Sequence, residues 1–167
     1  QDGHQDIGRL ECAMKQSAHQ LIEHEQAAII QRLTHLSASR DEETGNHMRR
    51  MAHISQLIAR ELGLDARFCE MLLLAAPMHD IGKVGIPDRI LLKPGQLDSV
   101  ERGIMQTHAR IGHDLLKDSH SELLRMGAEI ALTHHEKYSG EGYPNGLSGE
   151  AIPLSGRIVA TADVFDA

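Results

Sequence analysis

The chain has 167 residues, of which 41% are hydrophobic and 25% charged, as is typical of one globular domain with a core. Seventeen Lys and Arg against 24 Asp and Glu give a net charge of −7, which argues against a nucleic-acid polymer or a polybasic membrane patch as partner. Two cysteines cannot build a disulfide scaffold, and no signal peptide or membrane span is recognisable, so we expect a cytoplasmic location.

The first predicted element is a long helix over residues 7–36, in which apolar residues recur every seven positions. That row is Ile7, Met14, Leu21 and Ala28. Two interpretations stay open: an amphipathic helix packed on its own domain, or a coiled-coil-like connector that forms a homodimer and links an upstream sensor or receiver domain to the rest. We therefore divide the chain into a helical connector, residues 1–39, and a second domain, residues 40–167.

Two more helices are expected before the middle of the chain. One runs from about Asn46 to Leu62 and ends at Gly63. The next begins at Asp65 and runs into the segment PMHDIGK, where Pro77 should kink it. Residues 82–98 are expected to be loop and turn.

The last third of the chain is predicted to be helical on both sides of a glycine-rich loop. Asp98 and Glu101 form a capping box that opens a helix to about Lys117. Another helix is expected from about 121 to 135, residues 137–156 form the loop, and Ser155 caps a last helix. Because no segment alternates as a strand, the predicted fold class is all-α.

Histidines are the unusual feature of the composition: 12 are present, and histidine is the commonest metal ligand. His79-Asp80 lies at the end of an apolar helix, where an unpaired charge is costly. His134-His135-Glu136 forms a second cluster at a helix end, and Glu43 precedes His47 by four residues. Each group alone is weak evidence for a metal site, since each is also compatible with a surface pair.

Together these motifs resemble the HD-GYP family of metal-dependent cyclic di-GMP phosphodiesterases, a branch of the HD phosphohydrolase superfamily. The matching segments are ETGNH (43–47), HDIGKVGIPD (79–88), THARIG (107–112), HHEKYSGEGYP (134–144) and ATADVFDA (160–167). The resemblance covers residues 40–167 and implies an HD-type helical bundle preceded by the amphipathic helix. The family continues past the last of these motifs, so we expect the domain to be incomplete at its C-terminus.

The resemblance also implies the site residues. The implied metal ligands are Glu43, His47, His79, Asp80, His108, His134, His135 and Asp163. Asp80 would bridge two divalent ions, Glu43 would help to hold a third, and the mixed nitrogen and oxygen ligands favour iron or manganese. Lys83 would contact a substrate phosphate. The Gly142-Tyr143-Pro144 loop would lie beside the site, and the family also uses it for protein partners. Tyr143 is expected either to touch substrate or to cover the core.

The implied activity is hydrolysis of cyclic di-GMP to pGpG, GMP or both, through a metal-bridging hydroxide, in bacterial second-messenger signalling. The first alternative is a phosphodiesterase for another cyclic dinucleotide, such as cyclic GMP-AMP. The second is a catalytically silent sensor or interaction module.

Four further residues lie outside the implied ligand set. Asp166 is expected either to hydrogen-bond a ligand or to lie on the surface. His53, His113 and His120 are expected to be structural or solvated.

Overall fold

The computed structural model describes residues 45–167 and eight earlier positions, all of them helical: Met14, Ser17, Ile22, Glu25, Ala28, Ile29, Arg32 and Thr34. Most of the helix predicted over residues 7–36 therefore lies outside the described residues, as does the candidate ligand Glu43. The division between connector and second domain at residue 39 falls there too and stays a prediction.

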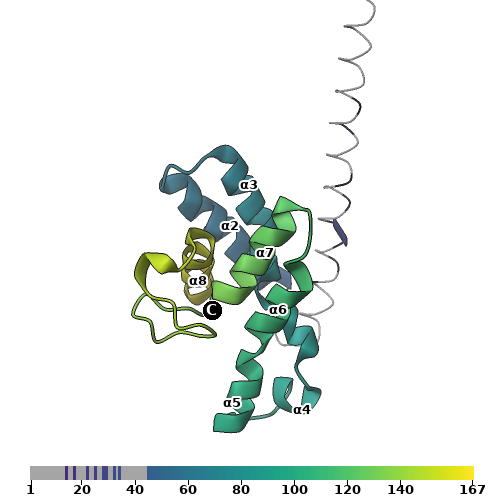
Figure 1. Ribbon diagram of the computed structural model, residues 1–167, viewed down its shortest axis with the longest axis vertical. Helices are drawn as coiled ribbons and strands as arrows, with labels where there is room; N and C mark the ends of the chain where they lie inside the picture. The colour runs from purple at the N-terminus through teal and green to yellow at the C-terminus, as the bar shows by residue number, and fades with distance from the viewer. Residues whose placement is uncertain are drawn as a thin grey trace, which may run out of the picture.

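Residues 45–167 form helices joined by loops, and no strand is assigned within them (Figure 1). The elements are α2 (Gly45–Glu61), α3 (Ala66–Ala75), η1 (Ala76–Gly85), α4 (Asp88–Leu91), α5 (Ser99–Gln106), α6 (His108–Leu116), α7 (Glu122–Thr133), η2 (Gly149–Ala151) and α8 (Leu154–Asp166). The all-α prediction is confirmed for this part of the chain.

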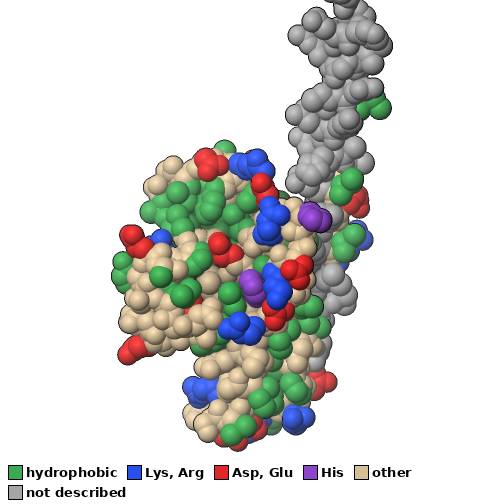
Figure 2. Space-filling model, in the orientation of Figure 1, with side chains coloured by type: hydrophobic (Ala, Val, Ile, Leu, Met, Phe, Trp, Pro, Cys, Tyr) green, Lys and Arg blue, Asp and Glu red, His purple; other side chains and the backbone are tan. Residues whose placement is uncertain are grey.

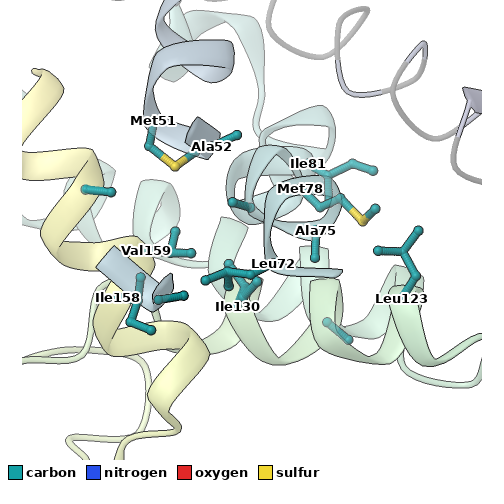
Figure 3. Close-up of a cluster of buried hydrophobic side chains, with 14 of the residues drawn as sticks. Met51, Ala52, Leu72, Ala75, Met78, Ile81, Leu123, Ile130, Ile158 and Val159 are labelled. Carbon is teal, nitrogen blue, oxygen red and sulfur yellow. The ribbon is translucent and has the colours of Figure 1, made fainter. Parts of the chain in front are cut away.

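The hydrophobic core lies between six of these elements (Figure 3), including α6, which contributes Leu116. It is built by Met51 and Ala52 of α2, Leu72 and Ala75 of α3, Met78 and Ile81 of η1, Leu123 and Ile130 of α7, and Ile158 and Val159 of α8. The η1 segment contacts α2, α3, α6 and α7, so it lies in the middle of the bundle. Its residues His79 and Asp80 are thereby held inside the fold.

The third helix does not kink at Pro77 as predicted. Instead α3 ends at Ala75, and a 3₁₀ helix begins with Pro77 in its first turn. Proline fits there because its missing N–H would lack a helical partner in any case. The segment 82–98, predicted to be loop, contains the end of η1 and the short helix α4 (Asp88–Leu91).

The helix predicted from Asp98 to Lys117 is two helices that meet at Thr107. Its capping box is confirmed: Asp98 Oδ1 accepts from the backbone N of Glu101 at 2.8 Å, and Glu101 Oε2 accepts from the N of Asp98 at 2.9 Å. At the break, Thr107 Oγ1 donates to the carbonyl of Ile104 at 2.6 Å. A side chain that bonds the backbone in this way competes with helical hydrogen bonding.

Ser155 does not cap the last helix, because α8 begins one residue earlier, after Pro153. Ser155 is buried, and its Oγ donates to Glu129 Oε1 of α7 at 2.5 Å. It therefore joins α7 to α8. Helix α7 itself ends at Thr133, so His134 is its C-cap rather than an interior residue.

Gly82 allows η1 to lie directly against α6. A Cβ atom at this position would collide with the backbone oxygen of His108 and the backbone nitrogen of Gly112. Only glycine permits so close an approach of two backbones. This contact brings the start of α6, with His108, next to Asp80.

Acidic and basic side chains are interspersed on the face shown in Figure 2, which carries no continuous patch of one charge. None of the helices in the described part of the chain is long and apolar enough to cross a bilayer.

Candidate metal centre

Seven of the eight predicted metal ligands lie together in two adjoining groups. The first is Asp80, His108, His134 and His135, and the second is His47, His79 and Asp163. Within each group the candidate ligand atoms all lie within 4.8 Å of one another. The residues come from α2, η1, α6, α8 and the end of α7, so the fold gathers residues more than a hundred positions apart.

Asp80 lies between the two groups. One carboxylate oxygen, Oδ1, is 3.1 Å from His108 Nε2 and 3.5 Å from His134 Nε2. The other, Oδ2, is 3.3 Å from Nε2 of His79, which belongs to the second group. A carboxylate with one oxygen toward each group has the geometry that a bridging ligand requires.

The histidines are held with Nε2 toward the centre by hydrogen bonds at their other ring nitrogen. Nδ1 of His79 is 3.0 Å from the carbonyl of Ala76, and Nδ1 of His108 is 2.7 Å from that of Met105. Nδ1 of His134 is 3.1 Å from the carbonyl of Ile130. A carbonyl can only accept, so each Nδ1 carries the proton, and the Nε2 lone pair of the neutral ring faces inward.

Burial keeps His134 and His135 in the neutral form that binds metal. Desolvation lowers the pKa of His134, and burial together with the neighbouring His134 and His108 lowers the pKa of His135 to about 2. Both rings are therefore neutral at neutral pH, and each can offer a lone pair to a metal ion.

This donor set fits divalent metal ions. His108 Nε2 and His134 Nε2 approach to 3.5 Å, and as acceptors in the tautomers above their lone pairs repel each other unless a cation lies between them. Imidazole nitrogens and carboxylate oxygens are ligands shared by iron, manganese and zinc. Cys69, the cysteine that the structure describes, is buried in the core and belongs to neither group.

The two predicted substrate-contacting residues border the centre. Lys83 Nζ lies 2.8 Å from Asp80 Oδ2, and the Lys83 side chain is 15% exposed. The ring of Tyr143 stacks on His135 with 4.6 Å between centroids. Burial and the charge of Asp80 raise the pKa of Tyr143, so its hydroxyl stays protonated and able to donate.

Asp166 makes the hydrogen bond that the sequence suggested as one of two possibilities. Its Oδ2 lies 2.7 Å from His47 Nδ1, and it also accepts from Arg50 Nε at 2.7 Å. The bond from Arg50 lowers the pKa of Asp166, so the carboxylate stays ionised. Asp166 thereby directs His47 Nε2 toward Asp163 Oδ1, which is 3.2 Å away.

Replacing Asp166 with alanine is therefore expected to weaken metal binding without removing a ligand. Carboxylates that orient metal-binding histidines typically contribute about 10–100-fold in metal affinity. Competition with a chromophoric chelator measures that affinity. Arg50→Ala, which leaves the bond between Asp166 and His47 in place, should have a smaller effect; an equal or larger effect of Arg50→Ala would contradict this assignment.

Glu136, the third residue of the HHE motif, belongs to neither group and instead holds the loop that carries Tyr143. It is 5% exposed, and its two oxygens accept from the backbone N of Asn145 at 2.8 Å and of Leu147 at 2.9 Å. Gly142 lies against the same segment: a Cβ there would come within 2.5 Å of the Glu136 Cα. The loop is therefore fixed relative to His134 and His135.

Glu136→Gln is expected to lower the free energy of unfolding by about 1–3 kcal/mol, since an amide can accept at only one end and leaves a backbone donor unsatisfied. Chemical denaturation measures the change. Glu141→Gln is the matched control, because Glu141 lies in the same loop with an exposed side chain. A Glu136 variant as stable as the control would show that the two hydrogen bonds do not hold the loop.

The remaining histidines of the described chain lie outside the centre, as predicted. His53 and His120 are exposed, and His113 Nδ1 is 3.2 Å from the carbonyl of Ala128. The roles of Glu136 and Arg50 were not predicted from the sequence. The HHE motif singled out Glu136, but no pattern distinguishes a carboxylate that binds metal from one that binds a loop.

Comparisons with known proteins agree with this arrangement. The HD domain family model matches residues 31–167. The chain is 48% identical to the cyclic di-GMP phosphodiesterase response regulator RpfG of Xanthomonas campestris, over 87% of this chain and 39% of that protein. It is 52% identical to a cyclic di-GMP phosphodiesterase of Thermotoga maritima, over 83% of this chain and 38% of the relative.

A further relative is named for another cyclic dinucleotide. The 3′3′-cGAMP-specific phosphodiesterase 2 of Vibrio cholerae is 48% identical over 83% of this chain and 27% of its own length. The chain thus spans less than half the length of these curated relatives. Its match to the family model covers most of its residues, including both ligand groups, and the chain belongs to the HD domain family.

Proposed function

We propose that the protein containing this chain is a metal-dependent phosphodiesterase that hydrolyses cyclic di-GMP. The observation that carries the proposal is the Asp80 carboxylate, placed between two groups of histidines whose Nε2 atoms converge on it. A pair of divalent ions, when bound at such a centre, polarises phosphoryl oxygens and supplies a nucleophile from water at neutral pH. A catalytically silent module would not need this arrangement.

Cyclic di-GMP is favoured as substrate by the relatives, of which those from X. campestris and T. maritima bear its name. The alternative is cyclic GMP-AMP, which is favoured by the name of the V. cholerae relative at 48% identity. Both substrates are cyclic dinucleotides with two phosphodiester bonds, so the chemistry at the centre is the same. They differ in one base, so residues other than the metal ligands must distinguish guanine from adenine.

The ligand atoms favour iron or manganese, because histidine and carboxylate without thiolate do not select zinc. In the proposed assignment His108, His134 and His135 hold one ion and His47, His79 and Asp163 the other, with Asp80 shared. Glu43, four residues before His47 in the sequence, is proposed to help hold a third ion.

The chain's own residues have distinct parts in the proposed reaction. Lys83 is proposed to neutralise charge on the non-bridging phosphate oxygens, because its ammonium group already lies against the anionic Asp80. Tyr143 is proposed to position the substrate, since its ring packs on His135 and its hydroxyl stays protonated. No serine or cysteine nucleophile is required, and the expected product is pGpG, GMP or both.

The test is chromatography of products after the full-length protein is incubated with Mn²⁺ or Fe²⁺ and each of two substrates. We expect pGpG or GMP from cyclic di-GMP at a rate at least tenfold above that for cyclic GMP-AMP. Faster cleavage of cyclic GMP-AMP than of cyclic di-GMP would show that cyclic GMP-AMP is the preferred substrate. Cleavage of neither substrate, with both metals bound, would contradict the proposal.

We also propose that the segment before residue 40 forms a homodimer and connects to a sensor or receiver domain in the cytoplasm. The Gly142-Tyr143-Pro144 loop is proposed as a separate contact site for protein partners. The seven-residue apolar repeat supports the dimer. Deleting residues 1–38 is expected to halve the number of chains per particle, as measured by light scattering. A dimer that persists after the deletion would contradict the connector interpretation.

A further inference from the structure

We propose that a cavity beside Tyr143, between α5, α6 and the loop after α7, is a subsite that recognises a guanine base of the substrate. This inference rests on the proposed function and adds to it the residues that choose the base. The cavity has a volume of about 390 Å³, within the range of small-molecule sites in proteins. Its lining includes Arg110, Asp114, Ile111, Tyr143 and Pro144.

The cavity adjoins the metal centre through Tyr143. Tyr143 lines the cavity, and its ring stacks on the candidate ligand His135 with 4.6 Å between centroids. The same ring is 6.2 Å from that of His108. A nucleotide whose phosphate lies at the metal ligands can therefore place its base on the other side of Tyr143.

The charged groups of the cavity suit a base better than a phosphate. Arg110 and Asp114 are four residues apart on α6 and so lie on one face of the helix. A phosphate presents only acceptors and would be repelled by Asp114, whose pKa is lowered by its hydrogen bond from Lys117. A ligand edge that carries both donors and acceptors satisfies both side chains.

Guanine has such an edge. Its N1–H and N2–H groups can donate to the Asp114 carboxylate, while O6 on the same edge can accept from Arg110; arginine is a frequent partner of guanine O6 in nucleic-acid recognition. Adenine presents a lone pair at N1 and a donor at position 6, so the same carboxylate would face an acceptor. Tyr143, Pro144 and Ile111 supply flat and apolar contacts for a ring of either kind.

The arginine is oriented by the loop that carries Tyr143. Arg110 Nη2 donates to Asn145 Oδ1 at 2.8 Å, and the backbone N of Asn145 donates to Glu136 Oε1 at 2.8 Å. Glu136 directly follows His134 and His135 in the chain. The position of the guanidinium is therefore tied to that of the metal centre, as selection between bases requires.

The experiment compares Asp114→Asn and Arg110→Ala with the wild-type full-length protein on three substrates. Cyclic di-GMP and cyclic di-AMP differ only in their bases, and bis(p-nitrophenyl) phosphate is a phosphodiester without a base. Each substitution is expected to lower kcat/KM for cyclic di-GMP by about 5–150-fold, mostly through KM, the scale of one bidentate contact to a base. The loss should exceed that for the other two substrates at least fivefold, so the preference for guanine falls.

Asp118→Asn is the matched control, because Asp118 is an exposed acid just beyond α6 that does not line the cavity, and it should behave as wild type. Equal losses on all three substrates, or no loss, would overturn the subsite. Calorimetry with pGpG separates the two claims. If the wild type does not cleave cyclic di-GMP but binds pGpG in an Asp114-dependent manner, the subsite holds and the proposed function fails. If cleavage is normal in both variants, the function holds and the subsite fails.

Discussion

Asp80→Ala is expected to abolish binding of metal to both ligand groups and to reduce turnover of cyclic di-GMP by about 10³-fold or more. Metal ions supply several kcal/mol of charge stabilisation in phosphoryl transfer, and each 1.36 kcal/mol corresponds to a tenfold change in rate. The Asp80 oxygens lie 3.1 Å from His108 Nε2 and 3.3 Å from His79 Nε2, so one substitution removes an anionic ligand from each group. Elemental analysis together with turnover measures both effects.

Two further variants make this result specific. Asp80→Asn keeps the shape of the side chain and removes its charge, so it should also lose metal, to a smaller extent. Asp88→Asn removes an exposed carboxylate at the start of α4, outside both groups, and should retain the wild-type metal content. An Asp80→Ala protein that is folded by circular dichroism and still holds two ions per chain would contradict the bridging assignment.

Lys83→Ala is expected to keep the metals and to lose rate, by about 10²–10³-fold, the scale for one charge contact in a transition state. The structure offers a competing explanation, because Lys83 Nζ lies 2.8 Å from Asp80 Oδ2 and could serve only to neutralise that carboxylate. In that case its removal would change the affinity for metal rather than kcat. Metal affinity and kcat, measured on the same preparation, separate the two roles.

Lys93→Ala is the matched control for this substitution. Lys93 also pairs with a carboxylate, since its Nζ lies 2.5 Å from Glu101 Oε2, but the pair lies outside the metal centre. It should turn over cyclic di-GMP at the wild-type rate. Wild-type kcat in the Lys83→Ala protein would show that Lys83 does not contact phosphate in the transition state.

Much of the fold could be predicted because its determinants are local. The apolar periodicity of α2 and α3, the glycine after α2 and the Asp98–Glu101 capping box are each set by residues within a few positions of one another. The incorrect predictions concern segments whose conformation depends on contacts between residues distant in the sequence. The 3₁₀ helix η1 packs against four neighbouring helices. The close approach of Gly82 to the backbone of α6 cannot be predicted from hydrophobic periodicity.

The residues of the candidate site could be predicted from the sequence, but their arrangement in space could not. Motif spacing picked out His79, Asp80, His134 and His135, and the structure brings them together with residues from α2, α6 and α8. Which oxygen of Asp80 faces which group depends on the packing of η1 and was not predictable. The same holds for Glu136, which binds the Tyr143 loop because that loop folds back on it.

The most direct test of the account is removal and return of metal in the full-length protein. After chelation and dialysis, hydrolysis of cyclic di-GMP is followed while Mn²⁺ or Fe²⁺ is added in known amounts per chain. We expect no hydrolysis without metal, and recovery that reaches its plateau at two or three ions per chain in the wild type but not in Asp80→Ala. Hydrolysis that persists in the metal-free protein, or recovers equally in the Asp80→Ala protein, would contradict a reaction at this centre.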